Sequence, residues 1–319
     1  MLLLQPALKE YLWGGRTLIA DYNKRGGPET VAESWELSTC LDGLTRIAGG
    51  PSAGRTLLQY LAERPESAGA GVAHNGALPV LVKLIDAQKP LSIQVHPDDA
   101  YARTTASSAG KTELWYILEA APGAFLYLGV DRPVSREEFA ARIRDNTVEE
   151  ILRHVPVRPG EAYYIPAGTL HAIGAGIVLA EVQQSSNLTY RVYDYGRLDA
   201  AGRPRALHIE QALAVARLSP AASAPPHGGR TRTAADAVRT DIVDCPYFAM
   251  HRLDVDGVYP FRTPHATFMH ALCISGAAKV FAHDGEIGIH KGDGVFLAAG
   301  EAVRMEGKAS LLLCGAGGR

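Results

Sequence analysis

The chain has 319 residues, of which 47% are hydrophobic and 21% are charged, and its formal net charge is −2. This length allows a large buried core and predicts about two domains. A nearly neutral chain offers no broad basic face, which argues against nucleic acid and anionic membranes as partners but leaves room for a local basic pocket that binds a phosphorylated metabolite.

The beginning of the chain and its cysteines bear on where the protein works. Residues 1–5 include three leucines but no basic residue, and Pro6 follows directly, so we expect no signal peptide. No run of about 18 apolar residues occurs, so no membrane-spanning helix is expected. The four cysteines are far apart and form no C-x-x-C pair, which predicts reduced thiols in a cytoplasmic protein.

Short apolar runs bounded by Gly, Pro or Asp recur along the chain and predict closely spaced β-strands. Such spacing is typical of a sandwich or barrel, so we expect a mainly β protein. In chain order, the expected strands cover residues 81–85, 114–118, 125–130, 162–165, 177–182, 271–274 and 294–297.

Helices are expected to be fewer. Residues 55–63 and 208–218 carry apolar side chains at helical spacing. Two more helices are expected after Ser135 and Thr147, because each of these residues is followed three positions later by Glu, as in a capping box. These two helices predict a small helical insertion over residues 132–155 of an otherwise β protein.

Residues 220–236 are rich in Pro, Ala, Gly and Ser and contain almost no large apolar side chain. This composition predicts a linker between two domains. We therefore expect an N-terminal domain over residues 1–218, a linker over 219–236 and a C-terminal domain over 237–319.

A weak internal repeat supports this division. The segment PGEAYYIPAG at 159–168 resembles KGDGVFLAAG at 291–300, and in each a Gly and an acidic residue precede a short apolar strand that ends at Ala-Gly. Both glycines suit tight turns. His171 follows the first copy, whereas Val303 holds the equivalent place after the second. The repeat predicts two domains of like fold, of which only the first keeps a polar ligand; chance similarity of a turn motif is the alternative.

The strongest local signal is the segment LSIQVHPD at residues 91–98. Because alternate residues of a strand share a face, Ser92, Gln94 and His96 are expected on one side, and Ile93 and Val95 on the other. A polar row opposite an apolar row suits the wall of a pocket inside a barrel.

Two further residues are candidates for the same pocket. Glu113 stands at the start of the strand expected at 114–118, and His171 follows the glycine turn at 166–170. Histidine nitrogens with carboxylate and amide oxygens suit a divalent ion such as zinc. A structural role for each residue is the alternative that spacing alone leaves open. The other nine histidines have no such context and are expected at the surface or in packing.

With these residues the chain resembles the type I phosphomannose isomerases, in their short bacterial form. The resemblance covers the order and spacing of four motifs through about residue 215, and more loosely the C-terminal part. The motifs are PLSIQVHPD (90–98), GKTELWY (110–116), IPAGTLHAI (165–173) and SNLTYRVYDY (186–195), with WGG (13–15) and AESW (32–35) in addition.

The resemblance implies two cupin-like jelly-roll or β-barrel domains, of which the N-terminal one is catalytic and holds one Zn²⁺, while the C-terminal one has no metal site. Arg191 falls on the arginine thought to act at the reacting carbons. The family's zinc ligands correspond to Gln94, His96, Glu113 and His171. Positions that line the family's pocket correspond to Trp13, Glu33, Lys83, Ser92, Lys111 and Glu181.

Two positions depart from the longer eukaryotic relatives. Those relatives have Tyr two residues after the last zinc histidine, where this chain has Ile173, and Lys six residues beyond the arginine, where it has Arg197. Roles of that Tyr or Lys therefore do not carry over to this chain.

The resemblance implies an aldose–ketose isomerase that interconverts mannose 6-phosphate and fructose 6-phosphate through a cis-enediolate. A metal and Arg191 would stabilise the oxyanion that forms as the proton leaves carbon. The catalytic base stays open between Glu181, Lys111, Glu33 and a hydroxide held by the metal. For the phosphate group, we expect Ser92 and Lys83, with Lys111 as a further candidate.

Two other classes of function remain as alternatives. A cupin dioxygenase would use a two-His, one-carboxylate iron site, against which the additional ligand Gln94 argues. A non-catalytic protein that binds a sugar phosphate would suit the metal-free second domain, whereas the ligand set and Arg191 favour turnover. A monomer is expected, since no heptad pattern or long apolar surface segment occurs. The sequence does not predict the metal bound in the cell, the breadth of sugar specificity or the pathway direction.

Overall fold

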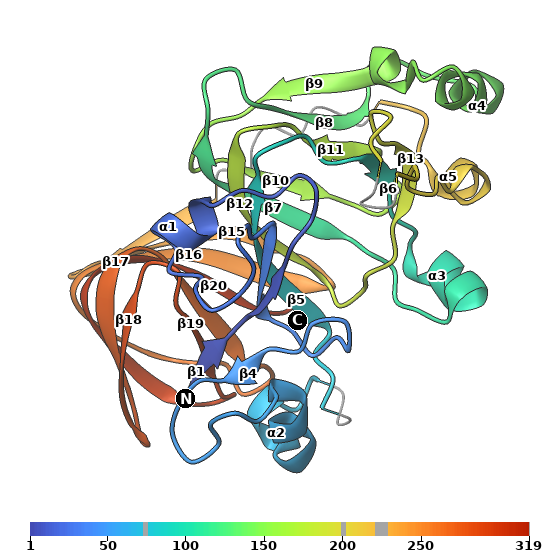
Figure 1. Cartoon of the computed structure of the whole chain (residues 1–319). Coiled ribbons are helices and arrows are strands. Elements are labelled where there is room, and N and C mark those ends of the chain that lie inside the picture. Colours follow the sequence, from blue (N-terminus) through green and yellow to red (C-terminus); the bar gives the residue numbers. More distant parts are fainter. Residues whose placement is uncertain (73–75, 199–201, 221–228, 319) are drawn as a thin grey trace.

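The computed structural model describes residues 1–72, 76–198, 202–220 and 229–318 and contains two antiparallel β-barrels that lie side by side (Figure 1). Two sheets of six and five strands build the N-terminal barrel, and one sheet of nine strands builds the C-terminal barrel. The expectation of a mainly β protein with two barrel-like domains is confirmed.

The N-terminal barrel encloses apolar side chains between its two sheets. Ile85 and Trp115 of the larger sheet pack with Leu126 and Leu128 of the smaller one. The larger sheet has the order β10 (Ala162–Ile165), β7 (Glu113–Ala120), β12 (Ile177–Gln184), β5 (Val80–Ala87), β3 (Glu33–Leu37) and β2 (Ala7–Lys9). The smaller sheet has the order β13 (Tyr190–Tyr193), β6 (Ile93–Val95), β11 (His171–Ile173), β8 (Phe125–Val130) and β9 (Leu152–Pro156).

The C-terminal barrel recruits two strands from the beginning of the chain, which lie among the orange and red strands of Figure 1. Its sheet has the order β14 (Arg230–Ala234), β15 (Ala237–Asp244), β16 (Phe248–Arg262), β20 (Ala302–Ala316), β17 (Met269–Ala282), β19 (Gly294–Leu297), β1 (Leu2–Gln5) and β4 (Arg46–Ile47), with β18 (Gly285–His290) paired to β17. Since β1 and β4 belong to this sheet, the sheet boundary does not follow the sequence division expected at residue 218.

Short helices lie outside the barrels. They are α1 (Thr17–Asp21), α2 (Leu57–Glu63), α3 (Asp99–Ala106), α4 (Arg136–Arg144) and α5 (Ile209–Val215), with 3₁₀ turns at Pro65–Ala68 and Val148–Ile151. Phe139 and Ile143 of α4 and Ala212 of α5 pack against Ile93 and Val95, on the outer face of the smaller sheet. None of the helices in the described part of the chain has the length and hydropathy that a membrane crossing requires.

The two barrels share one apolar core. Val80 and Val82 of β5 and Val182 of β12 belong to the same buried cluster as Phe248 and Leu312 of the C-terminal barrel. Every residue of β5 and β12 is buried, because these strands face the N-terminal barrel's interior on one side and the other barrel on the opposite side. This double burial explains their nearly continuous apolar sequences.

The internal repeat corresponds to the same local structure in both barrels. Gly160 and Gly292 have φ values of 90° and 98°, and they precede the short strands β10 and β19. Gly168 and Gly300 follow those strands with φ values of 87° and 70°. Such positive φ values suit glycine, so the repeated glycines mark repeated turns.

The helical insertion differs from the expectation in its second half. Ser135 caps α4 by accepting a hydrogen bond from the Glu138 amide, as the sequence predicts. Thr147 makes no such side-chain cap, and only a 3₁₀ turn follows it before the chain enters β9 at Leu152. The segment turns to strand because Leu152–Pro156 pairs with β8.

The expected linker at 219–236 is described only in part. Residues 221–228 lie outside the described residues, and Arg230–Ala234 form β14, which pairs with β15. The composition gave no strand signal because all five residues of β14 are exposed. The four cysteines are free, in line with the expected reduced thiols.

Candidate active site

Three strand ends bring the candidate metal ligands together inside the N-terminal barrel. His96 directly follows β6, Glu113 begins β7 and His171 begins β11, and all three side chains are buried. Gln94, in the middle of β6, lies opposite His171 on one neighbouring strand and opposite Arg191 on the other. The alternation expected for residues 92–96 is confirmed, since Ile93 and Val95 point into the opposite apolar cluster.

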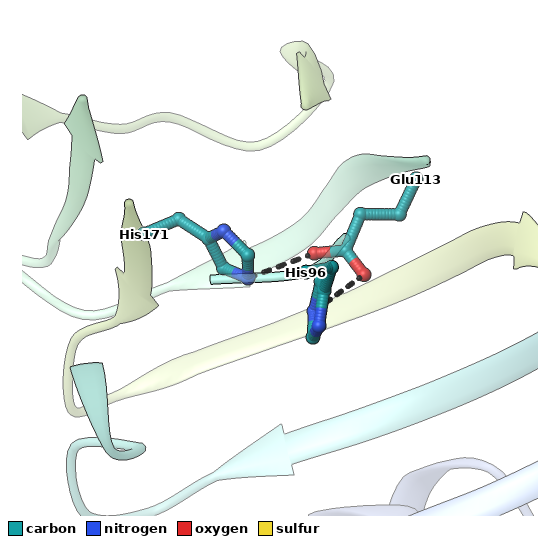
Figure 2. Close-up of side chains that lie close together, drawn as sticks. All are labelled: His96, Glu113 and His171. Atoms are coloured by element: carbon teal, nitrogen blue, oxygen red, sulfur yellow. Dashed lines mark ion pairs between the residues drawn. The ribbon is translucent and has the colours of Figure 1, made fainter. Parts of the chain in front are cut away.

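The Glu113 carboxylate lies between the two histidine rings, with one oxygen toward each (Figure 2). The distance from His171 Nε2 to Glu113 Oε1 is 3.2 Å, and that from His96 Nε2 to Glu113 Oε2 is 3.4 Å. The ligand atoms of these three residues all lie within 4.8 Å of one another. They therefore surround a single point in the barrel.

Backbone carbonyls determine which nitrogen of each histidine faces the carboxylate. His96 Nδ1 lies 2.9 Å from the carbonyl oxygen of Leu188, and His171 Nδ1 lies 2.8 Å from that of Thr169. Because a carbonyl only accepts, each Nδ1 carries the proton, and Nε2 of a neutral ring presents a lone pair. Burial lowers the pKa of His96 to about 3 and also lowers that of His171, so both rings are neutral at pH 7.

In this arrangement hydrogen-bond acceptors face one another, with no proton between them. Two neutral Nε2 lone pairs face a carboxylate, and among the described residues neither Glu113 oxygen receives a hydrogen bond of acceptable geometry. Burial raises the pKa of Glu113, but the Lys111 ammonium beside it outweighs that effect, and the pKa lies well below the usual range. A buried charge in this state needs a cation.

The donor set fits a divalent metal ion. Ligand atoms at about 2.0–2.2 Å from a tetrahedral zinc lie roughly 3.3 Å from one another, as the histidine and carboxylate atoms do here. Gln94 Nε2 lies 3.4 Å from His171 Nε2, and a flip of the amide would present its oxygen to the same point. Backbone acceptors on both Nδ1 atoms are the usual outer partners of metal-binding histidines.

Lys111 stands at the border between this centre and the cavity beside it. Its Nζ lies 3.0 Å from Glu113 Oε2 and 3.1 Å from His96 Nε2. The ammonium thus lies between His96 Nε2 and Glu113 Oε2 and supplies one positive charge there. It makes no such contact with the other facing pair of acceptors, His171 Nε2 and Glu113 Oε1.

A second charged group occupies the larger sheet. Lys83 Nζ lies 3.4 Å from Glu33 Oε2 and 3.3 Å from Glu181 Oε1, and 5.0 Å from the centre of the Trp35 ring. Burial alone would lower the pKa of Lys83, but Glu33, Glu181 and Glu113 outweigh it and raise that pKa. Lys83 is therefore a cation whose charge is already balanced by two carboxylates.

Arg191 lies on the opposite wall, in β13. Its Nε donates to Ser92 Oγ at 3.2 Å and its Nη1 donates to the carbonyl of Ala206 at 3.0 Å. No carboxylate within the described residues forms an ion pair with it. Arg191 thus keeps an uncompensated charge beside Gln94, its partner across the strands.

A cavity of about 380 Å³ joins these groups. It brings together all the residues expected in a pocket: Trp13, Glu33, Lys83, Ser92, Lys111, Glu181 and Arg191. Gln94 also lines it, whereas His96, Glu113 and His171 lie beneath the lining. This size suits a small metabolite.

The cavity also has lining residues to which sequence reasoning gave no role: Tyr11, Trp115, Asn187, Thr189 and Arg205. Trp115 lies within a motif that the sequence singled out, and its Nε1 donates to Glu181 Oε2 at 2.8 Å. Arg205 comes from an irregular segment after β13, where neither periodicity nor spacing gives a signal. Only the folded chain brings it to the pocket.

A different cavity, of about 280 Å³, opens in the C-terminal barrel. Asp241 within it pairs with Arg232 and Arg239, each at 3.0 Å, and with His251 at 2.9 Å. These groups satisfy one another, and no converging set of metal ligands lines this cavity within the described residues.

Comparison with known proteins identifies relatives for the whole chain. Residues 1–116 match the family model "Phosphomannose isomerase type I, catalytic domain", and residues 239–314 match "Mannose-6-phosphate isomerase, cupin domain". The second match confirms the cupin expectation for the C-terminal barrel.

The probable mannose-6-phosphate isomerase GmuF of Bacillus subtilis is 35% identical over 285 residues, which cover 88% of this chain and 87% of the relative. The mannose-6-phosphate isomerase of Streptococcus mutans is 34% identical over 296 residues, which cover 93% and 92%.

Solved structures share the same fold. The crystal structure of the mannose 6-phosphate isomerase from Bacillus subtilis has a TM-score of 0.91 at 32% identity and covers 98% of both chains. A mannose 6-phosphate isomerase bound with zinc and yttrium has a TM-score of 0.76 and covers 99% of both chains, at 19% identity. The fold of this chain is thus the fold of both structures.

Proposed function

Because this chain belongs to the type I phosphomannose isomerase family, we propose that it interconverts mannose 6-phosphate and fructose 6-phosphate in the cavity of its N-terminal barrel. The observation that carries the proposal is the buried Glu113 carboxylate between two histidine lone pairs, at the base of a cavity whose wall holds Arg191. Such a centre can bind a metal ion beside a polar substrate.

The metal in this proposal is one Zn²⁺, held by Gln94, His96, Glu113 and His171. The donor set of two imidazoles, one carboxylate and one amide supports a borderline divalent ion and leaves room for a further ligand. When bound, zinc supplies Lewis-acid polarisation of the substrate's oxygen atoms.

The reaction moves one proton between C2 and C1 of the open-chain sugar. Glu181 is the base that we assign to this transfer: it lines the cavity, Trp115 fixes one of its oxygens, and the other lies beside Lys83. Its carboxylate takes the proton from C2 and returns it to C1, while the hydroxyl proton passes from O2 to O1, so that the C1 aldehyde becomes an alcohol and C2 becomes the ketone. Glu33 and Lys111 line the same cavity and are the alternatives.

Arg191 and Lys111 stabilise the negative charge that develops on the sugar oxygens while the proton is off carbon. Arg191 carries a permanent charge, and Ser92 and the Ala206 carbonyl hold its guanidinium in place. A fixed cation in a cavity with little water lowers the energy of an oxyanion more than the same cation in bulk water does. Trp13 and Glu33 complete the wall that holds the sugar.

The test is a coupled assay of fructose 6-phosphate formation from mannose 6-phosphate, with the metal content of the same sample measured by elemental analysis. We expect turnover and about one zinc per chain. The exposed His290 provides a matched control, because His290→Ala should keep both properties whereas His171→Ala should lose both.

Two results would favour the alternatives. Iron in the protein together with oxygen uptake would support a dioxygenase, and tight sugar-phosphate binding without turnover would support a binding protein. Either result would contradict the isomerase proposal.

A further inference from the structure

The charges that line the cavity are unevenly distributed. On the side of the larger sheet, Lys83 pairs with the two carboxylates of Glu33 and Glu181. At the metal centre, Lys111 pairs with Glu113. The side chains of neither region leave a positive charge over for a dianionic phosphate group, and the Lys83 region has one carboxylate more than it has cations. In the proposed function the charge of the Zn²⁺ acts on the sugar oxygens rather than on the phosphate.

The opposite end, beside β13, has an excess of positive charge. Arg191 and Arg205 both line the cavity there. Arg191 forms no ion pair in the described part of the chain, and Arg205 shares its single partner, Asp194, with Arg197. Three guanidinium groups thus lie near one carboxylate. The nearby Arg205 also contributes to lowering the pKa of Arg191, after burial.

Asp194 holds Arg205 in a fixed orientation. Arg205 Nε donates to Asp194 Oδ2 at 2.6 Å, and its Nη2 donates to Oδ1 of the same carboxylate. Such a two-point contact fixes the plane of a guanidinium group. Arg205 Nη1 donates to no acceptor among the described residues, so its two N–H groups are available to a ligand.

Arg197 uses its donors differently. Its Nη1 donates to the Pro90 carbonyl at 2.6 Å, its Nε and Nη2 contact Asp194, and it does not line the cavity. Arg197 therefore ties the segment before β6 to the Asp194 loop, and the cation that reaches the cavity is Arg205.

We propose that Arg205, positioned by Asp194, binds the phosphate group of the substrate. The Arg191 guanidinium lies beside it, because Arg191 Nη1 donates to the carbonyl of Ala206, the next residue. In this arrangement Arg191 faces the sugar carbons near Gln94, and Arg205 anchors the far end of the molecule. The assignment rests on the proposed isomerase function.

Kinetics of Arg205→Ala test this role. A residue that binds only the phosphate contributes equally to ground and transition states, so its loss raises KM and leaves kcat nearly unchanged. Loss of charged hydrogen bonds predicts a KM for mannose 6-phosphate about tenfold to a hundredfold higher. Arg205→Lys keeps the charge but loses the two-point contact with Asp194, so its KM should lie between the other two.

A binding measurement separates this proposal from the isomerase assignment. Mannitol 1-phosphate has no carbonyl group and cannot be isomerised, so calorimetric titration reports its Kd without turnover. We expect Arg205→Ala to weaken this binding by the same tenfold to hundredfold, about the effect of losing charged hydrogen bonds, while unphosphorylated mannitol binds both proteins equally weakly. Thermal unfolding midpoints of both variants confirm that they are folded.

Arg197→Ala is the matched control, because it removes the other arginine on Asp194 and should change the Kd by less than about threefold. An Arg205→Ala protein with wild-type KM and Kd would overturn the phosphate assignment but not the proposed function. The same conclusion would follow if Arg197→Ala weakened the binding of mannitol 1-phosphate as much as Arg205→Ala does. A wild-type protein that binds mannitol 1-phosphate through Arg205 but lacks isomerase activity would refute the proposed function and keep the phosphate site.

Discussion

Burying a carboxylate without hydrogen-bond donors is costly unless a cation compensates its charge. Glu113 is fully buried, and its neighbours His96 and His171 present lone pairs to it. This cost supports the proposed metal centre, in which Lys111 supplies one further positive charge at the border. One side chain thus connects the fold of the barrel to the chemistry of its cavity.

Arg191 should matter for turnover rather than for stability. Arg191→Ala removes a fixed donor beside the developing oxyanion, so we expect kcat to fall by about 10²–10³. The variant should fold, because among the described residues the Arg191 side chain donates only to Ser92 and to the exposed Ala206, and its backbone contacts remain. Steady-state kinetics of the purified variant measure this effect, with its thermal midpoint as the control for folding.

The expected result for Arg191→Ala contrasts with the raised KM of Arg205→Ala. If Arg191→Ala raised KM without lowering kcat, or kept wild-type turnover, its role at the reacting carbons would be refuted.

At the scale of residues, local pattern predicted which side chains share the polar face of β6 but gave no signal for Arg205, which also lines the cavity. Ser92, Gln94 and His96 were predictable, because alternation along one strand places them on one face. Arg205 and Asp194 were not, because they meet through an irregular segment whose path depends on contacts distant in sequence, such as that of Arg197 with Pro90.

Among the elements, the repeated glycine turns offer a matched pair. A Cβ added to Gly160 would meet nothing within 4 Å, whereas one added to Gly292 would lie 2.0 Å from the carbonyl oxygen of Tyr22. The unfolding free energy of Gly160→Ala should therefore fall only by the strain of placing alanine at a positive φ, about 1–2 kcal/mol.

Gly292→Ala adds a backbone clash and should lose about 3 kcal/mol or more of unfolding free energy. Urea unfolding of the two variants measures the difference. If both variants lost the same unfolding free energy, the backbone near Tyr22 could move to accommodate the added Cβ at no cost. The two turns would then be equivalent in energy as well as in conformation.

Helices and strands were predictable where a short local pattern, such as a capping residue or an apolar run, determines the structure. Ser135 caps α4 as its sequence predicts, and β5, β7, β10 and β12 contain the expected strand segments. Thr147 shows the limit: its capping pattern yields only a 3₁₀ turn, because Leu152–Pro156 pairs with β8 and ends the helical geometry. The exposed strand β14 has no apolar alternation for any rule to detect.

For the whole molecule, the shared core predicts that the two barrels unfold as one cooperative unit. Leu312 of β20 is fully buried in the cluster that also contains Val80 and Val82. Leu312→Ala should cost about 2–5 kcal/mol. All three tryptophans belong to the N-terminal barrel: Trp35 lies in β3, Trp115 in β7, and Trp13 packs in the same apolar cluster as Trp115, so their fluorescence reports on that barrel.

We therefore expect Leu312→Ala to lower the urea midpoint seen by tryptophan fluorescence as much as the midpoint seen by circular dichroism. A tryptophan midpoint equal to that of the wild type would show that the barrels unfold independently.

The presence of two similar β units was predictable from the repeat, whose glycine turns flank β10 in one barrel and β19 in the other. The sharing of strands was not. β1 and β4 join the C-terminal sheet although β2 and β3, which lie between them in the chain, belong to the first barrel. This arrangement depends on the pairing of β1 with the distant β19 and of β4 with β1, which local sequence does not reveal.

The central claim is that one divalent ion, held by Gln94, His96, Glu113 and His171, makes the N-terminal barrel an isomerase. The most direct measurement is the rate of fructose 6-phosphate formation as zinc is added back to metal-free protein. The account predicts no activity without metal and a linear rise that ends at about one zinc per chain. Full activity in the metal-free protein would contradict it.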